Sequence, residues 1–126
     1  MCDKTILIVE DDRDIRLTLK DLLESEGYRV RVADNGAEGL DSLAHDDPPC
    51  LILLDLMMPV MDGWEFLKFR NKDQRLAKVP VVVVSAAGAN DLTQITTGFV
   101  VLQKPIHLDT FMHEVRAHCR PTPPAN

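Results

Sequence analysis

Short apolar runs alternate along the chain with amphipathic stretches. The runs are four or five residues long and rich in β-branched side chains, as buried strands are. Between the first two runs, Ile15, Leu19 and Leu22 recur at helical spacing, and Gly27 follows as a stop signal. The expected strands are residues 5–9, 28–32, 51–54, 80–84 and 99–102, and the expected helices are residues 14–26, 36–45, 62–75 and 108–119.

Strict alternation of strands and helices predicts an α/β fold, with a parallel sheet covered by helices on both faces. Residues 28–32 alternate between polar and apolar side chains, as in an edge strand. One domain is expected over residues 1–120, followed at 121–126 by a proline-rich tail or the stub of a linker. In such sheets the functional site lies beyond the carboxyl ends of the strands, where the winding direction reverses.

Composition and charge exclude several classes of function. The formal net charge of -6 makes nucleic acid an improbable direct partner, because phosphates repel an acidic surface. No apolar run approaches the roughly 18 residues of a membrane span, and acidic residues near the amino terminus argue against a signal peptide. The three cysteines show no CxxC spacing, so we expect free thiols, no disulfide and a cytoplasmic location.

Acidic residues stand where two apolar runs end. Glu10 and Asp11 follow the first run and Asp55 follows the third, so neighbouring strands would bring them about 5 Å apart. Carboxylates that close repel unless a cation neutralises them, and oxygen ligands favour Mg²⁺. We therefore expect Asp11 and Asp55 as direct Mg²⁺ ligands, with a backbone carbonyl from the loop after Asp55. Asp12 is better explained as a helix cap.

Two further polar residues belong to the other strand ends. Ser85 follows the fourth run, and Lys104 follows the fifth. Taken singly, a serine there is more often structural and a lysine more often a surface charge. Together with a cation and Asp55, however, they form a set suited to a phosphoryl group, whose transfer depends on positioning and charge neutralisation. Asp55 would be the nucleophile that forms an acyl phosphate.

Five motifs on these elements resemble those of the response regulator receiver domains of two-component signalling, from about residue 4 to residue 119. They read ILIVEDD, ADNGAEGL, LLDLMMPVMDG, VVVVSAA and QKPI. The resemblance implies a doubly wound, flavodoxin-like sheet of five strands in the order 2-1-3-4-5. It further implies Asp55 as phosphoacceptor, Glu10 and Asp11 as the acidic pair for Mg²⁺, the backbone carbonyl of Met57 as a ligand, and Ser85 and Lys104 on the phosphoryl oxygens.

The expected function is a phosphorylation switch rather than an enzyme acting on external substrates. A histidine kinase or histidine phosphotransfer protein would donate the phosphate, and a downstream protein, a fused output domain or a second copy in a homodimer would respond through residues 86–106. The alternatives are a protein-binding scaffold with vestigial phosphorylation and a Mg²⁺-dependent phosphohydrolase. The phosphohydrolase class needs a second acid two residues after its nucleophile, and that position is Met57 here, so this alternative does not fit.

One part of the chain departs from the receiver pattern. Receivers usually carry an aromatic residue three positions before the lysine, and here that residue is Val101. Residues 88–98 are rich in glycine and β-branched residues, which favour helix poorly. We therefore expect phosphorylation to order or move residues 86–98.

Overall fold

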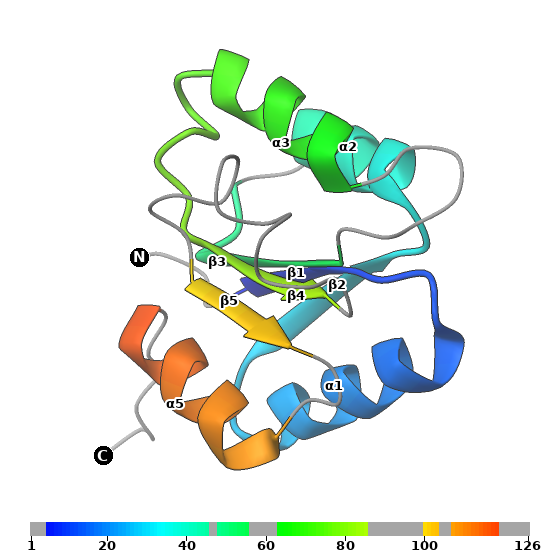
Figure 1. Ribbon diagram of the computed structural model, residues 1–126, viewed down its shortest axis with the longest axis vertical. Helices are drawn as coiled ribbons and strands as arrows, with labels where there is room; N and C mark the ends of the chain where they lie inside the picture. The colour runs from blue at the N-terminus through cyan, green and yellow to red at the C-terminus, as the bar shows by residue number, and fades with distance from the viewer. Residues whose placement is uncertain (1–4, 46–47, 56–62, 86–99, 104–106, 119–126) are drawn as a thin grey trace.

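The computed structural model describes residues 5–45, 48–55, 63–85, 100–103 and 107–118, with the backbone alone for a few of them, including Ser85 and Val101. Strands and helices alternate from Thr5 to Ser85, and a further strand and helix lie between Val100 and His118 (Figure 1). They are β1 (Thr5–Val9), α1 (Arg13–Ser25), β2 (Arg29–Ala33), α2 (Gly36–His45), β3 (Leu51–Asp55), α3 (Gly63–Lys72), β4 (Val81–Ser85), β5 (Val100–Gln103) and α5 (Leu108–His118).

All strand pairs in the sheet are parallel, and the strand order is β2-β1-β3-β4-β5. The parallel α/β architecture expected from the sequence is confirmed, and the strand order is the one that the resemblance implied. Strand β2 lies at an edge, as its alternating side chains indicated. The chain winds outward from β1 to β2 and then crosses to β3, so the winding reverses between β1 and β3.

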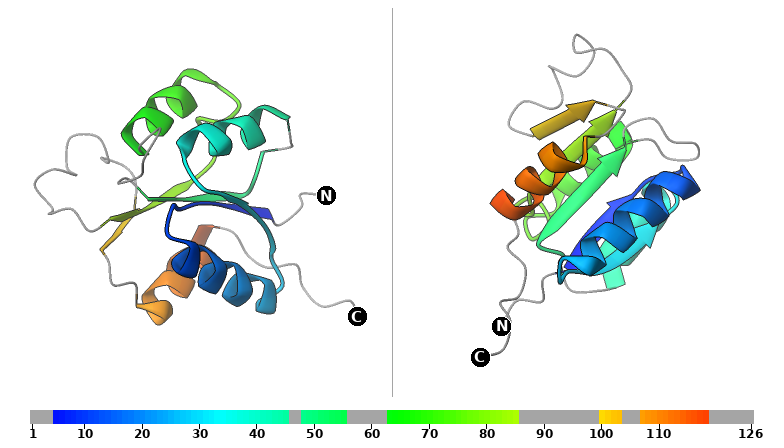
Figure 2. Two further views of the ribbon diagram at one scale, coloured as in Figure 1. Left: turned by 90° about the vertical axis from the view of Figure 1, so that its right-hand side faces the viewer. Right: turned by 90° about the horizontal axis from the view of Figure 1, so that it is seen from below.

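Helices cover both faces of the sheet, α2 and α3 on one and α1 and α5 on the other (Figures 1 and 2). Side chains alternate along each strand, so β1, β3 and β4 feed two separate hydrophobic clusters. Leu7 and Val9 belong to the cluster beneath α2 and α3, whereas Ile6 and Ile8 belong to the cluster beneath α1 and α5. This explains why the central strands are continuous apolar runs.

The ends of α1 follow from local chemistry. Asp12 is the N-cap, and its carboxylate accepts hydrogen bonds from the backbone N–H groups of Asp14 and Ile15. Gly27 takes a φ of 96°, and the backbone N–H groups of Gly27 and Tyr28 donate to carbonyls in the last turn of the helix. The capping role expected for Asp12 is therefore confirmed.

Helix α3 ends at Lys72, three residues before the predicted end at Arg75. Asp73 accounts for the difference, because its carboxylate accepts hydrogen bonds from the N–H groups of Arg75 and Leu76 and starts a separate turn. Phe66 is fully buried, whereas Phe69 is 51% exposed. The side of α3 that carries Phe69 therefore does not face the sheet.

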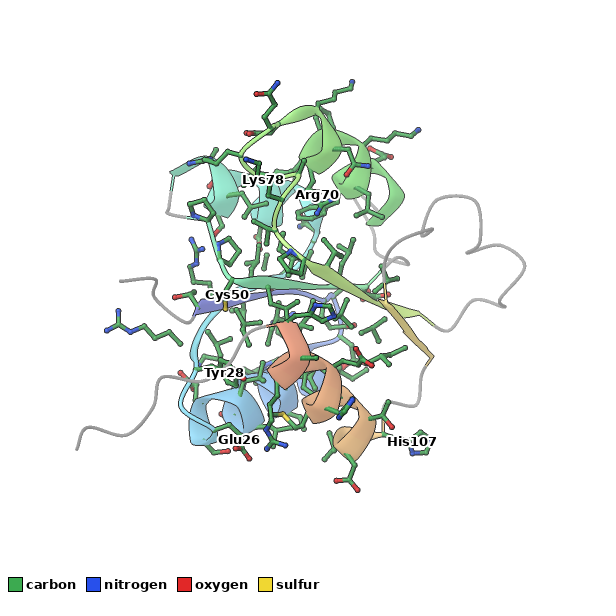
Figure 3. The ribbon with its side chains drawn as sticks, turned by 90° about the vertical axis from the view of Figure 1, so that its left-hand side faces the viewer. Glu26, Tyr28, Cys50, Arg70, Lys78 and His107 are labelled. Carbon is green, nitrogen blue, oxygen red and sulfur yellow. The ribbon has the colours of Figure 1, made fainter. Side chains whose placement is uncertain are left out.

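The expectation of three free thiols was also wrong. Cys50, which immediately precedes β3 (Figure 3), is disulfide-bonded, and its partner lies outside the described residues. Sequence spacing misses this pairing because folding decides which cysteines meet. Within the described ranges, none of the helices is long and apolar enough to cross a membrane.

Candidate functional site

The carboxyl ends of β1 and β3 meet in the middle of the sheet. Val9 pairs with Leu54 in the register between these strands. Glu10 follows Val9 directly and Asp55 follows Leu54, so the two carboxylates emerge side by side at one edge of the sheet. The backbone N–H of Glu10 donates to the carbonyl of Ala33 at 3.1 Å, which continues the pairing of β1 with β2 to this point.

Three carboxylates gather at this edge. Ligand atoms of Glu10, Asp11 and Asp55 all lie within 4.8 Å of one another. Glu10 and Asp55 are only 3% and 2% exposed, while Asp11 is open to solvent. The sequence-based expectation that these residues come together therefore agrees with the structure.

The chemistry of this cluster suits a hard divalent cation. Like charges at this separation repel, and burial of two of them reduces the screening by water. All three donors are oxygen atoms, and Asp11 leaves a side open to solvent, as Mg²⁺ requires when it keeps part of its water shell. The residues present therefore fit a Mg²⁺ ion.

Local hydrogen bonds hold the segment that carries two of these acids. One carboxylate oxygen of Glu10, Oε1, accepts a hydrogen bond from the backbone N–H of Asp12 at 3.2 Å. Asp12 in turn caps α1, so Glu10 and Asp12 have different tasks although both are acidic. The segment between β1 and α1 is thereby tied to both elements.

A basic residue that the sequence analysis did not single out also reaches this segment. Nη1 of Arg16, in the first turns of α1, lies 3.0 Å from the carbonyl oxygen of Glu10 and 3.4 Å from that of Asp11. The same nitrogen lies 3.2 Å from Oδ1 of Asp34, which follows β2. Helical side chains lean toward the amino end of their helix, so an arginine one turn after an N-cap was the available signal.

Of the remaining predicted site residues, the structure describes only the backbone of Ser85. Val84 pairs with Asp55, and Ser85 is the last residue of β4, so the backbone of Ser85 lies at the same edge of the sheet. Ser85 also pairs with Gln103 of β5, which immediately precedes Lys104. Lys104 and Met57 lie outside the described residues, as do residues 86–99, where the unusual output segment was expected.

The fold and the cluster together define an α/β protein with a cation-binding edge at the switch point of its sheet. Within that class the chain belongs to the response regulator receiver domain family, whose model matches residues 6–116. Members of this family are signalling domains that bind Mg²⁺ at an acidic pocket, take phosphate from histidine kinases and act on downstream partners.

Curated and solved relatives agree with this assignment. The polar-differentiation response regulator DivK of Brucella anthropi is 34% identical over 118 residues, which cover 91% of this chain and 95% of that protein. The response regulator TrrA of Thermotoga maritima, solved in complex with Mg²⁺-BeF, has a TM-score of 0.80 at 26% identity, over 90% of this chain and 97% of that one. A receiver protein from Pseudomonas putida, at 24% identity and a TM-score of 0.85 over 93% and 98% of the two chains, shows the same fold.

Proposed function

We propose that this chain is a phosphorylation switch in which Asp55 accepts a phosphoryl group. The observation that carries the proposal is the cluster of Glu10, Asp11 and Asp55 within 4.8 Å at the switch point. Asp55 ends a fully buried strand, which holds its carboxylate in one place at the rim of the sheet. A carboxylate so placed is suited to in-line attack on phosphorus.

The proposed roles follow from the chemistry of each group. Asp11, Asp55 and the backbone carbonyl of Met57 would hold Mg²⁺ directly, with Glu10 completing the acidic set. When bound, the cation supplies positive charge that offsets the negative charge of the phosphoryl oxygens. A carboxylate oxygen of Asp55 attacks the phosphorus of a phosphohistidine, the N–P bond breaks, and an acyl phosphate forms. Ser85 and Lys104 would bind the phosphoryl oxygens.

The proposed partners are those that this chemistry requires. A histidine kinase or a histidine phosphotransfer protein would donate the phosphate. Residues 86–106 would pass the change to a downstream protein, a fused output domain or a second copy of the chain. The span of the domain over residues 1–120, the tail at 121–126 and the cytoplasmic location stay predictions. The disulfide of Cys50 is unusual for a cytoplasmic protein.

Intact mass spectrometry tests the proposal. The full chain is incubated with Mg²⁺ and acetyl phosphate and compared with Asp55→Asn and with Asp21→Asn, which alters an exposed aspartate of α1. We expect one added phosphoryl group in the wild type and in Asp21→Asn, none in Asp55→Asn, and none when Mg²⁺ is chelated.

Beryllium fluoride separates a short-lived acyl phosphate from an inactive site. Binding of Mg²⁺ and beryllium fluoride by the wild type without a stable phosphoryl adduct would indicate rapid hydrolysis. Absence of both would contradict the proposal and favour the protein-binding scaffold.

A further inference from the structure

One guanidinium group bridges three segments at the acidic edge of the sheet. Nη1 of Arg16 reaches the backbone carbonyls of Glu10 and Asp11 and the carboxylate of Asp34 within 3.0 to 3.4 Å. These contacts join α1 to the end of β1 and to the residue that follows β2. Glu10 and Asp11 are the two residues whose side chains form the cluster together with Asp55.

The surroundings of Arg16 distinguish it from an ordinary surface charge. Its side chain is 13% exposed, whereas that of Lys20, one turn further along α1, is 33% exposed. Within the part of the chain that the structure describes, the ammonium of Lys20 pairs with Glu24 of its own helix, at 3.0 Å. The ion pair of Arg16 with Asp34 is half open, since the carboxylate of Asp34 is 61% exposed, so surface screening weakens that contact. The carbonyl contacts of Arg16 therefore matter most for its position.

We propose that Arg16 is a positioning residue for the cation site, through its hold on the carbonyls of Glu10 and Asp11. This inference rests on the proposed function, because it takes the cluster to be a Mg²⁺ site. A donor fixed to the backbone of adjacent ligands restricts the directions in which their carboxylates point. Hydrogen bonds that orient the ligating groups themselves commonly contribute tenfold or more to metal affinity.

A positioning role and a purely electrostatic effect of Arg16 predict opposite changes in Mg²⁺ affinity when Arg16 is replaced, so a binding measurement can distinguish them. A positive charge near a cation site disfavours the cation through repulsion. If charge were its only influence, removing it would strengthen Mg²⁺ binding. If Arg16 positions the ligands, removing it weakens Mg²⁺ binding, although a repulsive charge has gone.

Titration calorimetry with MgCl₂ on the full chain decides between these. We expect Arg16→Gln to raise the Kd for Mg²⁺ about tenfold. Arg16→Lys keeps the charge but lacks the planar fork of donors, so we expect its Kd to rise about threefold or more. Amide exchange without metal should be faster at Asp11 and Asp12 in both variants than in the wild type.

Two matched variants serve as controls. Lys20→Gln removes a positive charge from the same helix without touching the acid-bearing segment, and should leave the Kd unchanged. Asp34→Asn weakens the ion pair but leaves both carbonyl contacts, and should change the Kd by less than about twofold. Thermal melts of every variant show whether it is folded at the temperature of the titration.

The outcomes distinguish failure of the proposed function from failure of the positioning role of Arg16. No Mg²⁺ binding by the wild type, or binding unaffected by Asp11→Asn, overturns the proposed function and this inference with it. Wild-type binding that needs Asp11, together with an unchanged or lower Kd in Arg16→Gln and unchanged amide exchange, overturns the positioning role alone. A weaker affinity in both Arg16 variants with faster exchange supports it.

Discussion

At the scale of single residues, Tyr28 combines burial with an ionisable group. It is the only tyrosine in the chain, is 4% exposed, and lies on the side of the sheet covered by α1 and α5 (Figure 3). Burial raises the pKa of its phenol above the ordinary value of 10.0. Arg116 opposes the shift and Glu26 adds to it, although these two also form an ion pair of 3.3 Å with each other.

This shift predicts how stability depends on alkaline pH. A raised pKa means that the folded state favours the neutral phenol, so the contribution of Tyr28 is fully present below about pH 10 and is lost as pH rises through the folded pKa. We expect the tyrosinate absorbance of the folded protein to appear at higher pH than that of the denatured chain. Tyr28→Phe should remove the corresponding loss of stability. A folded midpoint at or below the denatured one would contradict the prediction.

Some residues of the site could be predicted from the sequence and one could not. Asp12 was recognisable as a cap because an N-cap acts within three residues of itself. Arg16 was not singled out, although its contacts with the carbonyls of Glu10 and Asp11 span only five or six residues. Only its contact with Asp34 depends on the pairing of β1 with β2. Glu10 and Asp11 were recognisable because an acid after an apolar run has few structural explanations.

At the scale of elements, helix α2 lies unusually close to its neighbours at Gly39. A Cβ atom there would stand 3.0 Å from Cε2 of Phe66 on α3 and 3.0 Å from Cγ2 of Val9 on β1. Both neighbouring side chains are fully buried and have little room to give way. Gly39 therefore permits the close approach of three elements.

Gly39→Ala should lower the free energy of unfolding. Alanine would contribute about 1 kcal/mol through helix propensity, but overpacking a dense core costs about 1–3 kcal/mol. We expect a net loss of about 1 kcal/mol in urea unfolding. Ala37→Gly, at an exposed position of the same helix, gives the propensity term separately. A net gain in Gly39→Ala would mean that the ring of Phe66 moves aside.

Most element bounds were predictable to within a residue or two, because caps, glycines and apolar periodicity act locally. Helix α3 was the exception, and Asp73 shows why. An aspartate can continue a helix or bind nearby backbone N–H groups, and here it accepts from Arg75 and Leu76. Which option is taken depends on where the following residues pack, and Leu76 packs into the core.

At the scale of the whole molecule, the disulfide of Cys50 links the start of β3 to a distant part of the chain. The backbone N–H of Cys50 donates to the carbonyl of Thr5 at 2.8 Å, so the residue is held beside β1. Cys50 is the only one of the three cysteines within the described residues. A crosslink here restricts the unfolded chain more than it alters the folded sheet.

Alkylation tests this link. In denaturant without reductant, iodoacetamide should modify one thiol per chain, and after reduction it should modify all three. Reduction should lower the melting temperature. A disulfide from Cys50 to Cys2 or Cys119 closes a loop of roughly 50 or 70 residues, which contributes about 4 kcal/mol on the chain-entropy account. Cys50→Ser should melt like the reduced wild type. Three modified thiols without reductant would show that the disulfide is absent.

The sequence by itself determined the alternation of strands and helices, the burial of the central strands and the acids placed at their ends. These features follow from side-chain polarity and from backbone rules that act over a few residues. Only the tertiary structure decided that Glu10, Asp11 and Asp55 stand within 4.8 Å, that Arg16 contacts Asp34, and that Cys50 forms a disulfide. Each of these depends on segments far apart in the chain, which only register and packing bring together.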